Sequence, residues 1–315
     1  MKDDAEGTGR GATAAAADSA WGATGTMRIS LQNILFATDF SAVSTTALEH
    51  ALSIARRYDS RIYLAHVIRP DAYQLVPPEA VANVSEQARR YAEQQMAQLL
   101  VSGRLRDIPH QVLLKHGELW PVLAAAIQEH AVNLVVVGTH GRTGVRKLLL
   151  GSVAEEIFRM ASCPVLTVGP KVAGEVPAEA ALKRILYATD FTPHAERASA
   201  YAFSLAQEHQ AHLTLLHVVQ GAGEVSAPAS AKLTEFFLRQ MRQLVPEGAD
   251  LWCDPEFRVD FGDPADEILK VTAEINAYLV VLGVRRSATF AGHLPPATAY
   301  KVVCQAPCPV LTVRG

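Results

Sequence analysis

The sequence predicts an α/β protein built from two similar domains, each a five-stranded parallel sheet with helices on both faces. Three segments recur in the same order: 33–40 with 184–191, 134–138 with 279–283, and 163–168 with 308–313. Their nearly constant spacing indicates that one unit of about 140 residues occurs twice. In each unit, short apolar runs alternate with helical patterns. Strands this uniformly apolar are typical of a parallel sheet covered on both faces.

The first unit begins with a strand that ends before Asp39. Ser41 is a suitable N-cap for the next helix, which is expected to bury Ala47, Leu48, Ala51, Leu52 and Ala55. In the long second helix one buried side is expected to hold Val81, Val84, Ala88, Tyr91, Gln95 and Leu99. The expected strands are 33–38, 61–67, 111–115, 134–137 and 165–168, and the expected helices are 41–58, 78–100, 121–130 and 152–161.

The second unit repeats this order with a shorter second helix. Between His217 and Gly262 it has six residues fewer than the first unit has between His66 and Gly117. The expected strands are 184–189, 213–219, 256–260, 278–282 and 310–313, and the expected helices are 193–209, 229–244, 264–274 and 297–304.

The two units divide the chain into four parts. Residues 1–27 are rich in Ala, Gly and Thr without periodicity, so we expect a disordered tail and not a signal peptide. The first domain spans 28–170, an eleven-residue linker spans 171–181, and the second domain spans 182–315.

Bulk composition narrows the class of protein. The formal net charge of −3 gives no reason to expect a nucleic acid or an anionic membrane as partner. No apolar stretch approaches the roughly 20 residues that span a bilayer. Of the four cysteines, Cys163 and Cys308 precede equivalent strands and are expected in the core. We expect a cytoplasmic protein and no metal site in the chain, since Cys304 and Cys308 lack paired ligands.

One loop carries a glycine pattern of the kind that can bind an anion. It reads Gly138-Thr-His-Gly141, then nine residues, then Gly151-Ser152 at the start of a helix. In such sheets ligands bind beyond the carboxyl ends of the strands, and free N–H groups at a helix N-terminus favour an anion. Arg142, Arg146 and Lys147 add positive charge. These residues indicate a phosphate cradle, or a glycine-rich turn that leads into a capped helix.

The combination of motifs resembles the universal stress protein family. The motifs are Gly-x2-Gly-x9-Gly-Ser after a Val-rich strand, Ala-Thr-Asp-Phe-Ser after the first strand, and Cys-Pro-Val-Leu at the last. The resemblance covers about residues 28–315 as a tandem pair. It implies two Rossmann-like domains of the adenine nucleotide alpha hydrolase type, with strand order 3-2-1-4-5 in each.

The resemblance also implies ATP, with Mg²⁺ or Mn²⁺ held through its phosphates. Ala37, Asp39 and Gly138 would lie by the ribose, and the backbone of Val67 would hold adenine. The phosphate region would comprise Gly141, Arg142, Gly151, Ser152 and Val153. His140 would donate to the phosphates or be an ordinary loop residue.

Two other positions have structural alternatives. Asp39 could help to cap the next helix, and Asp190 keeps its place in the second unit. His66 and His217 recur on equivalent strands, which favours half-buried structural histidines over acid–base groups.

The second unit lacks the glycine pattern. Its loop reads Gly283-Val-Arg-Arg286, and Pro296-Ala297 replaces Gly151-Ser152. Proline can start a helix but has no N–H to offer a phosphate. A weak anion contact is compatible with the positive charge of Arg285, Arg286 and His293.

No P-loop, His-Glu-x2-His or Gly-x-Ser-x-Gly motif occurs, and no nucleophile–base pair stands out, so no catalytic residue is assigned. The first hypothesis is a stress-response protein that binds one ATP in its first domain and acts on an unidentified protein partner without catalysis. The alternatives are a nucleotide-free dimerisation or interaction scaffold and a slow ATP hydrolase. The resemblance further implies that the two Cys-Pro-Val-Leu-Thr-Val strands pair, which would make the chain its own pseudo-dimer.

Overall fold

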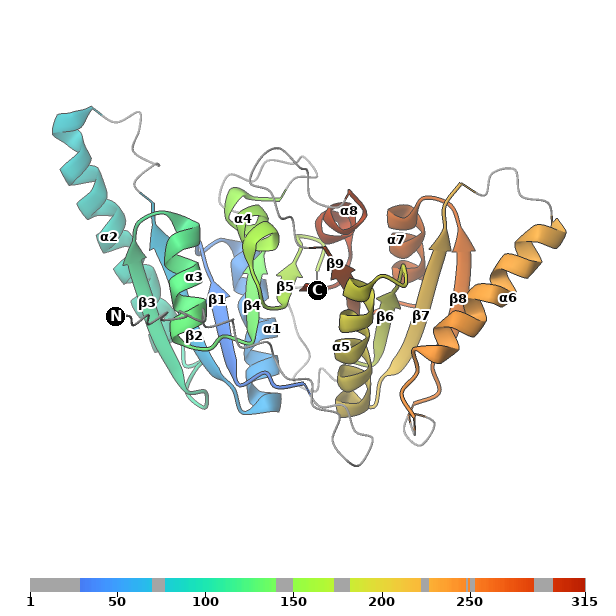
Figure 1. The fold of residues 1–315 in the computed structure, drawn as a ribbon. Helices are drawn as coiled ribbons and strands as arrows, with labels where there is room; N and C mark the ends of the chain where they lie inside the picture. The colour runs from blue at the N-terminus through green and yellow to red at the C-terminus, as the bar shows by residue number, and fades with distance from the viewer. Residues whose placement is uncertain are drawn as a thin grey trace, which may run out of the picture.

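The computed structural model describes residues 29–69, 77–139, 150–172, 182–221, 227–247, 249, 253–285 and 297–314. The predicted tail, most of the predicted linker and residues 140–149 of the glycine loop lie outside these ranges. Within the described ranges, strands and helices alternate along the chain (Figure 1).

The elements of the first half follow the predicted order. Its strands are β1 Asn33–Ala37, β2 Arg61–Ile68, β3 His110–His116, β4 Leu134–Gly138 and β5 Val165–Val168. Its helices are α1 Ala42–Tyr58, α2 Pro78–Val101, α3 Leu119–Glu129 and α4 Ser152–Met160.

The second half repeats the order. Its strands are β6 Arg184–Ala188, β7 His212–Val219, β8 Glu256–Phe261, β9 Leu279–Val284 and β10 Val310–Arg314. Its helices are α5 Pro193–His209, α6 Ala227–Gln243, α7 Pro264–Glu274 and α8 Ala297–Gln305. Helix α6 has 17 residues against 24 in α2, so the missing residues fall largely in this helix, as predicted.

The ten strands of the described ranges form one sheet of order β3-β2-β1-β4-β5-β10-β9-β6-β7-β8. Each half therefore has the order 3-2-1-4-5 among its own strands, with parallel neighbours. The halves join where β5 pairs antiparallel with β10, with Leu166 opposite Leu311. The hydroxyls of Thr167 and Thr312 donate across this junction to the carbonyls of Val310 (3.1 Å) and Val165 (3.3 Å). The two identical segments thus make the same contact in both directions.

Helices cover both faces of the sheet. Residues of α1, α2, α5 and α6 pack on one face, in a core that includes Phe36, Leu64 and Phe203. Residues of α3, α4, α7 and α8 pack on the other. Both cores cross from the first half into the second, because β5 and β10 lie together at the middle of the sheet (Figure 1).

The face of α2 that packs on the sheet differs from the predicted one. Ala92 and Met96 are buried, whereas Tyr91 is 41% exposed. Figure 1 shows that the first part of α2 projects past the end of the sheet. Val84, Ala88 and Leu99 of the predicted face are partly buried, so the hydrophobic spacing misplaces the stripe only near its middle, at Tyr91.

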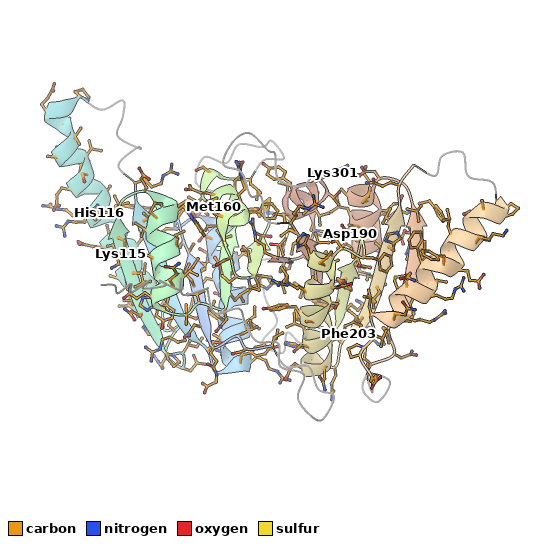
Figure 2. The ribbon with its side chains drawn as sticks, viewed as in Figure 1. Lys115, His116, Met160, Asp190, Phe203 and Lys301 are labelled. Atoms are coloured by element: carbon orange, nitrogen blue, oxygen red, sulfur yellow. The ribbon has the colours of Figure 1, made fainter. Side chains whose placement is uncertain are left out.

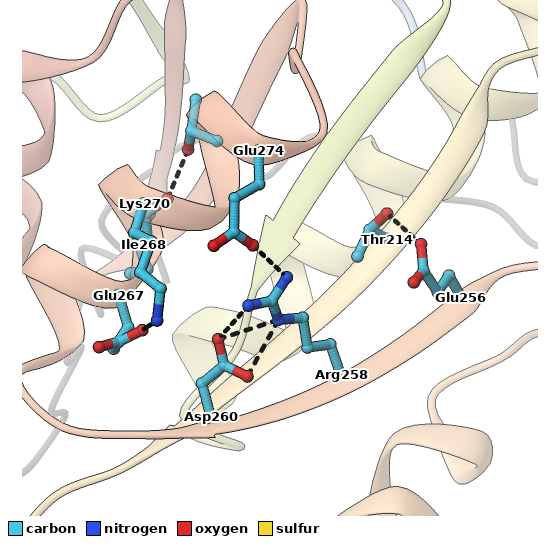
Figure 3. Close-up of polar contacts among 9 residues, drawn as sticks. Thr214, Glu256, Arg258, Asp260, Glu267, Ile268, Lys270 and Glu274 are labelled. Atoms are coloured by element: carbon cyan, nitrogen blue, oxygen red, sulfur yellow. Dashed lines mark hydrogen bonds and ion pairs between the residues drawn. The ribbon is translucent and has the colours of Figure 1, made fainter.

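An ion-pair network connects β8, the edge strand of the second half, to helix α7 (Figure 3). Arg258 on β8 contacts Asp260 on the same strand at 2.8 Å and Glu274 at the end of α7 at 2.6 Å. The hydrogen bonds that the Arg258 guanidinium donates to both carboxylates, above all to Asp260, raise its pKa. Because β8 is an edge strand, these contacts stabilise one end of the sheet.

The cysteines are free thiols, and Cys253, Cys304 and Cys308 are buried, whereas Cys163 is partly buried. Burial raises the pKa of the Cys308 thiol to about 12, so it stays protonated and apolar. No helix in the described ranges is long and apolar enough to cross a membrane.

Candidate functional site

A cavity of about 510 Å³ opens at the carboxyl ends of β1 and β2. Its wall is mainly apolar on the sides formed by β2, α2 and α3, through Val67, Val84, Ala88, Leu119 and Leu123. Polar groups lie at the strand ends. This is the edge where a parallel α/β sheet of this order binds ligands.

The turn after β1 presents Asp39 to the cavity. The backbone N–H of Ser41 donates to Oδ1 of Asp39 at 3.0 Å, and Phe40 between them has a φ of 61°. The second half repeats this turn, because Thr192 N–H donates to Asp190 at 3.0 Å and Phe191 has a φ of 59°. Asp39 therefore shapes the entry to α1 as well as lining the cavity, and the capping alternative holds for one of its oxygens.

His66 also has a structural partner. Its Nδ1 lies 2.7 Å from the carbonyl oxygen of Thr38, and the carbonyl can only accept, so Nδ1 carries the proton. His217 repeats the contact to Thr189 at 2.8 Å, and burial lowers the pKa of this imidazole. Each histidine ring packs on the neighbouring Phe40 or Phe191, with centroids 4.6 and 4.8 Å apart. This geometry agrees with the structural role expected for both.

Helix α4 aims its first turn at the same edge of the sheet. Gly151 takes the N-cap position with φ −62° and ψ 151°, and Ser152 and Val153 follow. The N–H of Gly151 donates to the carbonyl of Thr139 at 2.7 Å. The expectation of a free Gly151 N–H is therefore wrong, because the turn itself uses this donor. The N–H groups of Ser152 and Val153, at the first two positions of the helix, have no intrahelical acceptor.

Sequence reasoning missed Arg69. This residue follows β2, lines the cavity, and its guanidinium donates to the Ser152 hydroxyl at 3.3 Å. It brings a cation to the first turn of α4. Its one signal in the sequence is its place directly after β2, at the carboxyl edge of the sheet.

Gly138 has a packing role of its own. A Cβ atom there would lie 3.1 Å from the backbone of Val43 and Ser44 in α1. At Gly283 the corresponding Cβ would lie 2.5 Å from His194 and Ala195. The close approach of helix to strand therefore requires glycine at Gly283 and favours it at Gly138, whatever the loop binds.

The predicted site residues divide into three groups. Ala37, Asp39, Val67 and Val153 line the cavity. Gly138, Gly151 and Ser152 lie at the end of β4 and the start of α4, which the Ser152–Arg69 contact connects to the cavity wall. His140, Gly141 and Arg142 lie outside the described residues.

The second half fills the matching position with an aromatic ring. Phe237 lies one helical turn before the buried Met241, as the small Ala92 lies one turn before the buried Met96. The Phe237 ring stacks on Phe191 at 5.8 Å and lies 4.1 Å from the His217 ring. Figure 2 marks Asp190 at this edge of the second half. In the second half an aromatic side chain thus packs on both rings of the turn, whereas in the first half Tyr91 lies edge-on to Phe40 at 6.4 Å and lines the cavity.

The site can therefore hold a ligand of mixed character. The apolar walls suit a planar ring, Asp39 can accept from hydroxyl groups, and Arg69 with the first turn of α4 suits an anion. The structure holds no group of three or more His, Cys, Asp or Glu side chains that could bind a metal ion, within the ranges it describes.

Comparison with known proteins gives one consistent result. The model of the universal stress protein family matches residues 30–169 and again 181–314. A universal stress protein of Mycolicibacterium smegmatis is 27% identical over 292 residues, which cover 89% of this chain and 96% of the relative. One from Methanocaldococcus jannaschii is 28% identical over 138 residues, 44% of this chain and 81% of its own.

A solved structure agrees at the level of the fold. The crystal structure of a universal stress protein from Archaeoglobus fulgidus aligns with a TM-score of 0.64 and 21% sequence identity. The alignment covers 90% of this chain and 98% of that one. The arrangement of two joined α/β units is therefore shared with a solved protein.

Proposed function

The chain belongs to the universal stress protein family, and we propose that it binds one ATP molecule in its first half and acts as a non-catalytic, cytoplasmic regulator of a stress response. The observation that carries this proposal is the 510 Å³ cavity whose wall joins apolar surface, Asp39 and Arg69.

Adenine would lie against Val67 and the apolar side chains of α2 and α3, and the ribose hydroxyls would reach Asp39. Arg69, Ser152 and the first N–H groups of α4 would bind the phosphates, because guanidinium groups and helix N-termini both favour anions. A divalent cation would be held mainly by the phosphates. His140, Gly141 and Arg142 remain predicted phosphate contacts.

The second half supports a stoichiometry of one. Phe237 packs on Phe191 and His217 at the equivalent strand ends. Pro296-Ala297 stands where the first half has Gly151-Ser152, so the hydroxyl that contacts Arg69 in the first half has no counterpart here. We infer that this half serves as a fixed partner, and that the β5–β10 junction makes the chain a pseudo-dimer.

A nucleotide-free scaffold is the second candidate. The observation that favours it is Gly138, which suits the packing of α1 even without a ligand. Slow ATP hydrolysis is a third, and it would need an ordered water and a metal ion next to the phosphates.

Mass spectrometry of the freshly purified, denatured protein separates these candidates. The proposal predicts a co-purified adenine nucleotide, and titration of the emptied protein with ATP should restore binding. Failure of the emptied protein to bind ATP would favour the scaffold. Steady formation of ADP from the added ATP would favour the hydrolase.

A further inference from the structure

A second cavity, of about 240 Å³, lies between the two halves of the chain. Helix α1 contributes Ile54 and helix α5 contributes Leu205, and the strands at the junction contribute Leu166 and Leu311. Leu31 and Leu182, which precede β1 and β6, also line it. The cavity therefore lies toward the amino ends of the first strand of each half, whereas the cavity with Asp39 and Arg69 lies at carboxyl ends.

These lining residues come in pairs that the duplication relates. Ile54 and Leu205 hold the same position in α1 and α5, and Leu166 and Leu311 face each other across the junction. The polar positions break this symmetry. Where α1 has His50, α5 has Tyr201, and where α1 ends in Tyr58, α5 ends in His209. The duplication has thus produced one cavity on the symmetry axis with unlike polar groups on its two sides.

Two imidazole nitrogens in this wall are buried without a hydrogen-bond partner among the described residues: Nε2 of His50 and Nε2 of His209. The tautomer of His209 follows from its other nitrogen. Its Nδ1 faces the backbone N–H of Leu182 at 3.4 Å and so accepts, which leaves the proton of the neutral ring on Nε2. His209 therefore presents an unused donor.

The cavity suits an uncharged ligand. Within the described ranges, no Asp, Glu, Lys or Arg side chain lines it. Burial lowers the pKa of His50 to about 4, and burial, followed by the nearby Arg57, lowers that of His209. Both rings are therefore neutral at pH 7 and offer hydrogen bonds instead of charge.

We propose that this cavity is a binding site for a neutral aromatic molecule of one or two rings that carries a hydrogen-bond acceptor such as a hydroxyl group. The rings would fill the space between Ile54, Leu205, Leu166 and Leu311. Because neighbouring protein atoms cover Nε2 of His209, its imidazole would turn toward the cavity to donate to the acceptor. A dry apolar cavity of roughly 150 Å³ already accepts benzene, so the larger volume here has room for a second ring.

The ligand would stabilise the folded protein in two ways. An unfilled apolar cavity and a buried donor without an acceptor both destabilise a folded protein. A ligand with both features relieves both. Small-molecule sites also occur preferentially at interfaces between domains, with apolar walls and few polar groups. This proposal does not depend on nucleotide binding, since the two cavities share no lining residue in the part of the chain that the structure describes.

Fluorescence titration of the full chain with 1-naphthol, and equilibrium dialysis with naphthalene, test the proposal. Naphthol has the ring and the hydroxyl, whereas naphthalene has the ring alone. We expect one saturable naphthol site per chain and about two- to tenfold weaker binding of naphthalene, the effect of one net hydrogen bond. Absence of saturable naphthol binding would overturn the proposal.

Variants then locate the site. Ile54→Trp should weaken naphthol binding about tenfold or more because the indole occupies the space, and Leu205→Phe repeats the test from α5 if Ile54→Trp does not fold. Thr45→Trp adds the same side chain to the exposed side of α1 and should leave binding unchanged. His209→Leu should reduce the preference for naphthol over naphthalene to about one, whereas His209→Gln should retain it. Unchanged naphthol binding in both filling variants would contradict the assignment, as would an unchanged preference in His209→Leu.

Discussion

The guanidinium of Arg69 lies 3.3 Å from the hydroxyl oxygen of Ser152. This contact joins the end of β2 to the first residue of α4, two elements that are separated by most of the first half of the chain. It places the positive charge of Arg69 at the positive end of a helix. Like charges in one place favour an anion between them, which is the reason to assign the phosphates to this corner of the cavity.

Replacing Arg69 with alanine tests that assignment. We expect ATP affinity to fall by about 1–2 kcal/mol, the range for a lost charge-assisted hydrogen bond at a partly exposed position. Adenosine, which has no phosphate, should bind equally well to both proteins. Arg61→Ala is the matched control, because Arg61 is an exposed arginine at the opposite end of the same strand. An equal loss for adenosine would show that Arg69 does not act on the phosphates.

Filling the cavity from α2 tests where the base lies. Ala88 lines the cavity, so Ala88→Trp should lower the affinity for ATP and for adenosine about tenfold or more. Ala97→Trp places the same side chain on an exposed position of the same helix and should change neither affinity. Calorimetry on both variants gives the comparison. Normal adenosine binding to Ala88→Trp would move the base out of this cavity.

The two residues at the start of α4 give a matched pair of proline variants. Gly151→Pro suits the local φ of −62° but breaks the bond to Thr139. Its free energy of unfolding should fall by about 1 kcal/mol, with little change in ATP affinity. Ser152→Pro keeps a favoured first helical position but takes away an N–H and a hydroxyl. It should lower ATP affinity about tenfold or more. The reverse ranking of the two affinities would contradict the observed use of the Gly151 donor.

The symmetry of the junction between the halves predicts equal effects of two substitutions on stability. Thr167→Val and Thr312→Val each take away one hydroxyl that donates across the β5–β10 ladder. Each should reduce the free energy of unfolding by about 1 kcal/mol, since valine keeps the shape and loses one hydrogen bond. Urea unfolding measures both. A large difference between the two would mean that the duplicated strands do not contribute equally.

Much of the fold could be predicted from the sequence because the same order of strands and helices occurs twice in the chain. Helix α5 spans Pro193–His209 and α7 spans Pro264–Glu274, the same bounds that are predicted from the sequence. Thr192 and Asp263 cap these helices through their side chains. Such local signals fix the ends of helices. The strand order within each half then follows from the family resemblance.

The misplaced face of α2 has a different cause. Tyr91 and Ala92 are neighbours; Ala92 is buried, whereas Tyr91 lines the cavity and contacts Phe40. The cavity is a property of the assembled fold, so local spacing does not show which of the two is buried. The domain boundaries at 28–170 and 182–315 stay predictions, as do the roles of the individual site residues.

The candidate site could be predicted only where its residues lie on regular elements. Asp39 follows from its position just after the first strand and Val67 from the family resemblance, and both line the cavity. Arg69 has no motif around it, and its role emerges from the approach of β2 to α4. The cavity that contains His50 and His209 could not be predicted from the sequence, because its walls come from both halves. These walls come together only when β5 pairs with β10.

Calorimetric titration of nucleotide-free protein with ATP tests the central claim most directly. The open cavity beside Arg69 and the aromatic side chains at the equivalent place in the second half predict one bound ATP per chain. The expected result is a stoichiometry near one. Ala88→Trp should abolish this binding or strongly reduce its affinity. A stoichiometry near two, or no binding by the folded protein, would contradict the claim.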